Sequence, residues 1–65
     1  MINKNKILRV EFSNKILTAV KNSNGAIWYY EVFSKSKNEI IANISQHEFL
    51  KNYYPHIALE NPLIN

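Results

Sequence analysis

The sequence contains no cysteine and no aspartate, only one glycine and only two prolines. Without cysteine, the chain can form neither a disulfide framework nor a thiolate metal site, and a small domain without disulfides fits a reducing compartment. A single glycine cannot build a glycine-rich loop that cradles phosphate groups. We therefore expect no bound cofactor.

The chain of 65 residues is too short for most catalytic architectures. It forms one domain at most, and folding buries only about 60% of the surface that the unfolded chain exposes. A domain of this size often has a stability of only about 3–5 kcal/mol. It has no room for a deep cleft, and no nucleophile–base pair is recognisable. We predict one non-enzymatic domain over residues 1–65, with a flexible basic arm at 1–5 and a tail at 58–65.

Long apolar runs are also missing. The first six residues are polar and basic, and no run of signal-peptide length or of the roughly 20 residues of a membrane span follows them. We expect a cytoplasmic protein without a membrane partner. Eight basic residues against five glutamates give a net charge of +3 and a pI near 9.3. This balance permits a nucleic acid or another anionic partner, but an AT-rich genome produces the same abundance of Lys, Asn and Ile.

Three stretches in the first half are typical of β-strands. Residues 7–12 alternate between apolar and charged side chains, residues 16–20 are rich in β-branched side chains, and residues 26–33 follow a turn. Asn24-Gly25 is the strongest short hairpin signal because a type I′ turn needs positive φ at both central positions. The pattern predicts a three-stranded antiparallel meander in an α+β domain, packed by one or two C-terminal helices.

A two-residue turn at Asn24-Gly25 sets the expected register of the second and third strands. It pairs Ser23 with Ala26, and it places the following residues opposite each other: Lys21 and Trp28, Ala19 and Tyr30, Leu17 and Val32, Val20 and Tyr29, Thr18 and Glu31, and Ile16 and Phe33. The more apolar face is assigned to the core, with Leu8, Val10, Phe12, Leu17, Ala19, Trp28, Tyr30 and Val32. The second face is mixed and holds Arg9, Glu11, Val20, Tyr29, Glu31 and Phe33. A one-residue slip would exchange the two faces.

The second half contains two Ser-x-x-Glu capping boxes, Ser36 with Glu39 and Ser45 with Glu48. The second is the better signal because Phe49, Leu50, Tyr53 and Tyr54 follow on one helical face that ends at Pro55. Residues 39–44 fit a fourth strand by their β-branched content and a short helix by their cap. Residues 55–65 form a tail that either packs on the domain or becomes ordered on a partner.

This order of signals resembles the KTSC domain, which occurs at the C-terminus of some lysyl-tRNA synthetases and as stand-alone bacterial proteins. The stretches that carry the resemblance are ILTAVKNSNGAIWYYEV and EIIANISQHEFLKN. The sequence departs from the family pattern at Trp28, which replaces a Tyr, and it lacks the Pro and the second Gly expected further on. The resemblance implies that residues 37–43 are helical, and it implies RNA binding. RVEFSNKILTAV and ISQHEFLKNYY are also similar to the small single-stranded-DNA-binding fold of transcriptional coactivators.

Two classes of partner fit the second face: RNA or single-stranded DNA, and a protein, including a second copy in a homodimer. Aromatic rings on an exposed sheet face can stack on bases or become buried in an interface. The candidate residues are Arg9, Tyr29, Phe33, Lys15, Lys21 and Lys35. Trp28 and Tyr30 are interpreted as core rings. His47 and His56 are too few to bind a metal, and Glu11 with Glu31 shows no pocket for a catalytic carboxylate pair.

Overall fold

The computed structural model describes residues 6–60 and 62–64, so the predicted basic arm at 1–5 lies outside the described residues. The elements are β1 (Arg9–Glu11), β2 (Lys15–Lys21), β3 (Ile27–Ser34), β4 (Glu39–Ser45), α1 (Gln46–Asn52), the 3₁₀ turn η1 (Tyr54–His56), α2 (Ile57–Glu60) and β5 (Leu63–Ile64). The α+β class is confirmed. Within the described residues, no helix has the length and apolar character to span a membrane.

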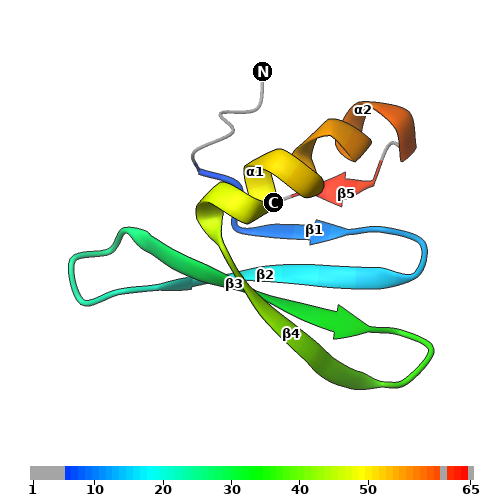
Figure 1. Cartoon of the computed structure of the whole chain (residues 1–65), viewed down its shortest axis with the longest axis horizontal. Helices are drawn as coiled ribbons and strands as arrows, with labels where there is room; N and C mark the ends of the chain where they lie inside the picture. Colours follow the sequence, from blue (N-terminus) through cyan, green and yellow to red (C-terminus); the bar gives the residue numbers. More distant parts are fainter. Residues whose placement is uncertain (1–5, 61, 65) are drawn as a thin grey trace.

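All strand pairs of the sheet are antiparallel, and the strand order is β4-β3-β2-β1-β5. The predicted meander forms its centre, and β4 and β5 extend it at the two edges. In Figure 1 the helices lie on the side of β1 and β5, and β4 is the edge furthest from α2. The stretch 39–44, which the sequence left open, is therefore a strand, and the helix that the KTSC resemblance implied for 37–43 is not present.

The β2–β3 connection differs from the predicted type I′ turn. Gly25 has φ +82°, whereas Asn24 has no positive φ, and the Asn22 N–H donates to the Ala26 carbonyl at 2.8 Å. This is a three-residue loop with a glycine in the left-handed region, a common hairpin geometry. Asn22 organises it, because its Oδ1 accepts the N–H groups of Asn24 and Ala26 at 2.9 and 3.1 Å.

A β-bulge at Trp28 corrects the register that this loop would otherwise shift. Lys21 pairs with Ile27 and not with Trp28, whereas Val20 pairs with Tyr29 as predicted. Trp28 is thus an extra residue on β3. The remaining predicted pairs of β2 and β3 are confirmed from Tyr29 to Phe33. The prediction that Trp28 is a core ring is wrong, because 66% of the residue is exposed.

The core lies between the sheet and α1. Its buried apolar residues are Ile7, Val10, Phe12, Leu17, Tyr30, Val32, Ile44 and Phe49. The Phe49 ring stacks on Tyr30 with centroids 4.1 Å apart, and the Tyr30 hydroxyl donates to the Ile7 carbonyl at 2.6 Å. Leu8 is 39% exposed, contrary to prediction, because the chain before β1 turns Ile7 inward in its place.

Helix α1 begins where the second capping box predicted. Ser45 is its N-cap, and the Ser45 hydroxyl accepts the Glu48 N–H at 3.1 Å. The first capping box starts no helix, since its Ser36 lies in the turn that leads into β4. After η1 and α2 the chain returns to the sheet, where β5 pairs with β1 through Val10 and Ile64. Much of the segment predicted as a tail is therefore part of the domain.

Candidate interaction surface

The sheet face that points away from α1 has no element packed on it in the described part of the chain. Cross-strand pairing arranges its side chains in rows that run across the sheet. The first row is Leu63, Glu11, Ile16, Phe33 and Ile40, and the second is Arg9, Thr18, Glu31 and Asn43. Val20, Trp28 and Tyr29 follow at the hairpin end. We call these residues the open face.

The first row of the open face is mostly apolar, the second row is polar, and the surface is hollowed between them. A shallow groove of about 330 Å³ is lined by Arg9, Ile16, Thr18, Glu31, Phe33 and Ile40. Ile40 is 53% exposed and Leu63 is 70% exposed, at opposite ends of the first row. Contiguous apolar surface with a polar component is typical of interaction sites.

The bulge gathers two aromatic rings at the hairpin end of the open face. The centroids of Trp28 and Tyr29 are 5.4 Å apart, with the rings at 72°. Neighbouring side chains in a regular strand point to opposite faces, so this contact depends on Trp28 being the extra residue. The third adjacent ring, Tyr30, points into the core, where burial raises its pKa. The three consecutive aromatics thus divide between the open face and the core.

The charges on the open face are largely paired. Glu11 accepts from Lys35 Nζ at 2.7 Å and from Arg9 Nη2 at 3.4 Å. The hydrogen bond and the charge of Lys35 lower the pKa of the Glu11 carboxyl. Glu31 lies one strand beyond Thr18, and within 6–60 and 62–64 it has no cation at ion-pair distance. Arg9 and Lys35 thus carry as many positive charges as Glu11 and Glu31 carry negative ones, although both cations contact Glu11.

The structure brings only some of the predicted site residues together. Arg9, Tyr29 and Phe33 belong to the open face, and Lys35 joins them through Glu11. Lys21 lies elsewhere, in a groove of about 560 Å³ on the helix side of the sheet. That groove is lined by Lys6, Leu8, Lys21, Gly25, Ala26, Ile27 and Gln46.

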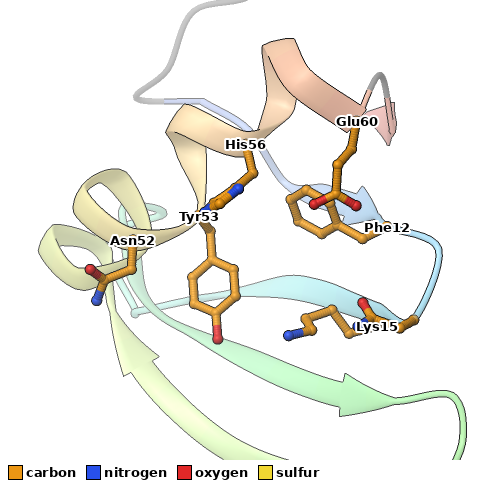
Figure 2. Close-up of a pocket in the computed structure, with 7 residues that line it drawn as sticks. Phe12, Lys15, Asn52, Tyr53, His56 and Glu60 are labelled. Atoms are coloured by element: carbon orange, nitrogen blue, oxygen red, sulfur yellow. The ribbon is translucent and has the colours of Figure 1, made fainter.

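Lys15 also lies away from the open face, in a small pocket beneath the helices. The pocket is lined by Phe12, Asn14, Lys15, Asn52, Tyr53, His56 and Glu60. Figure 2 shows the Lys15 side chain extending toward the Tyr53 ring, with Nζ 5.5 Å from the ring centroid, a cation–π contact. The pocket volume is about 160 Å³, whereas ligand pockets usually measure about 300–1,000 Å³. We therefore regard this pocket as a weaker candidate site than the open face.

Sequence reasoning missed four members of the open face: Trp28, Ile40, Asn43 and Leu63. A register without a bulge places Trp28 on the core face, whereas the bulge leaves it exposed. Ile40 and Leu63 became visible only once β4 and β5 had been placed at the sheet edges. One feature of the sequence does indicate that a ring of this stretch is exposed: three consecutive rings on one strand cannot all enter a single core.

No protein-family model, no curated protein and no solved structure matches this chain.

Proposed function

We propose that this protein is a small non-catalytic binding module of the cytoplasm that docks on a protein partner through its open face. The observation that carries the proposal is the pairing of Arg9 and Lys35 with Glu11 beside exposed apolar side chains. Interfaces between proteins are enriched in aromatic residues and Arg at their centres and are depleted of unpaired charge. The open face carries aromatic rings and Arg9, and the charges of Arg9 and Lys35 on and beside it are paired with Glu11.

The charge distribution favours a protein over a nucleic acid. Phosphate binding derives its affinity from cations that neutralise phosphates and release counterions. On the open face both nearby cations already have a carboxylate partner, and Glu31 adds a negative charge close to Arg9 across Thr18. A phosphate backbone would have to break these pairs and approach two carboxylates.

RNA or single-stranded DNA is a second candidate partner, and the exposure of Trp28 favours it. This ring is 66% exposed and contacts Tyr29. Stacking of a base on an aromatic side chain contributes about 1–3 kcal/mol. The KTSC resemblance also implies RNA binding. Under this hypothesis the two rings stack on bases, and Lys35 leaves Glu11 to contact a phosphate.

A photo-crosslinking amino acid in place of Phe33 tests the proposal in the cells that naturally produce the protein. The matched control carries the same group in place of Lys51, which is exposed on α1. We expect a protein adduct from position 33 that resists nuclease and is absent from position 51. A nuclease-sensitive adduct would favour the second candidate, and identical products from both positions would contradict a role of the open face.

Binding of a random single-stranded oligonucleotide at two salt concentrations tests the second candidate directly. Phosphate-led binding weakens steeply with salt, with a log–log slope of about −0.7 per phosphate neutralised on single strands. If nucleic acid is the partner, Tyr29→Ala lowers the affinity by the stacking contribution. If a protein is the partner, the chain shows no salt-dependent affinity and the substitution changes nothing in this assay.

A further inference from the structure

We infer that the protein partner is a second copy of this chain, packed open face to open face about a two-fold axis along β2. The inference rests on the proposed function, since it names the occupant of the same surface. It follows from how the charges and the apolar side chains are distributed about the central strand.

Strand β2 is the middle strand of the sheet, with β3 and β4 on one side and β1 and β5 on the other. A two-fold axis parallel to β2 and between two facing sheets keeps each row in place and exchanges its two halves. The residue on β1 then faces the partner's residue on β3, and the residue on β5 faces the partner's residue on β4. Such an interface is isologous, because the same surface is used by both copies.

The second row is self-complementary in charge under this operation. Arg9 and Glu31 lie on either side of Thr18, one strand away in each direction. The axis therefore places Arg9 opposite Glu31 of the partner subunit and forms this ion pair twice. It supplies a cation to Glu31, which has none nearby among the described residues. Arg9 can serve two carboxylates because its guanidinium carries five N–H donors.

The first row is self-complementary in its apolar residues. Ile16 faces its own copy at the axis, and Ile40 faces Leu63 of the partner subunit. Ile40 and Leu63 are the most exposed large apolar residues of the row, at 53% and 70%. Glu11 faces the ring of the opposing Phe33 and keeps its carboxylate on Lys35 of its own chain.

The size and the net charge of the surface also suit a dimer. The molecule measures 33 × 28 × 18 Å, so its broad side is large enough for the about 800 Å² per partner that a stable interface buries. The +3 charge of the chain does not oppose the contact, because Arg9 and Lys35 are balanced by Glu11 and Glu31. Face-to-face packing of two sheets is a common architecture.

A charge exchange tests this arrangement. The wild-type chain, Arg9→Glu, Glu31→Arg and the double variant are compared by sedimentation equilibrium over a range of concentrations, with circular dichroism as a check on folding. Lys37→Glu, in the β3–β4 turn, is the matched control. We expect a dimer for the wild-type chain and for the control. Each single variant dimerises at least about tenfold more weakly, because like charges then face each other, and the double variant recovers the affinity.

Three results would overturn the inference: a monomeric wild-type chain, undiminished dimers of both single variants, or a folded double variant that remains monomeric. The crosslink from position 33 separates this failure from that of the proposed function. If the wild-type chain is monomeric but position 33 crosslinks to a different protein, only the self-association is wrong. If it is monomeric and position 33 gives no protein adduct, both are wrong.

Discussion

Truncation of Phe49 to alanine tests how strongly α1 is bound to the sheet. The side chain is fully buried, and its ring stacks on Tyr30 at 4.1 Å with an interplanar angle of 14°. Removing a buried phenyl ring usually costs about 3–5 kcal/mol, because transfer and cavity terms add. Helix α1 has seven residues, and isolated helices shorter than about 12–15 residues are marginal in water. Loss of the ring therefore detaches the helix as well.

The expected loss is as large as the whole stability of the domain. A domain below about 70–80 residues rarely has a core worth more than about 3–5 kcal/mol. We therefore expect Phe49→Ala to be largely unfolded in the absence of denaturant. Circular dichroism during a urea titration is the appropriate assay, because the exposed Trp28 reports poorly on core burial.

Leu59→Ala is the matched control for this measurement. Leu59 lies in α2 and is 79% exposed, so its truncation should change the free energy of unfolding by no more than about 0.5 kcal/mol. Phe49→Leu should fall between the two, since it retains part of the buried volume. If Phe49→Ala had the same urea midpoint as Leu59→Ala, α1 would contribute nothing to the core and the assignment of Phe49 would be refuted.

Three further predictions concern single side chains. In dilute solution Trp28 should emit like a water-exposed indole and be quenched readily by iodide, because the ring is 66% exposed; blue-shifted, protected emission would contradict the bulge. Tyr30→Phe should destabilise the protein by about 1–3 kcal/mol in urea titrations, because it leaves a buried carbonyl without its donor, whereas Tyr29→Phe should have no such effect. The folded-state pKa of Glu11, measured by NMR, should lie below the unfolded value near 4.5 and rise in Lys35→Met. Because it is lowered, the stabilisation by this pair is present above pH 4.5 and is lost as the pH falls through the folded-state pKa; an unchanged pKa in the variant would exclude Lys35 as the cause.

The sequence alone was sufficient for the local features. The period-two alternation before Phe12, the β-branched run of β2 and the N-cap at Ser45 are each determined by neighbouring residues, and each forms the predicted kind of element. The first strand, however, spans only Arg9–Glu11 and leaves Leu8 exposed. The register of β2 and β3 was also predicted, although the turn was not. The three-residue loop is one residue longer than the predicted turn and shifts the pairing by one position, and the bulge at Trp28 restores the predicted register. The predicted pairing of Tyr30 with Ala19 is therefore correct, but it depends on the bulge, which the Asn24-Gly25 turn signal does not predict.

Tertiary structure decided which face each contested residue occupies. Ser36 and Glu39 can cap a helix, but residues 39–45 form a strand because they pair with β3 along nearly their whole length. Trp28 is exposed because it is the extra residue of a β-bulge. A bulge depends on the pairing of two strands, so the sequence of one strand does not reveal it. Lys15, Lys21 and Lys35 look alike in the sequence, yet they lie in three different environments. Local residue patterns determine strands, turns and caps, whereas pairing across strands determines which side chains meet on one surface.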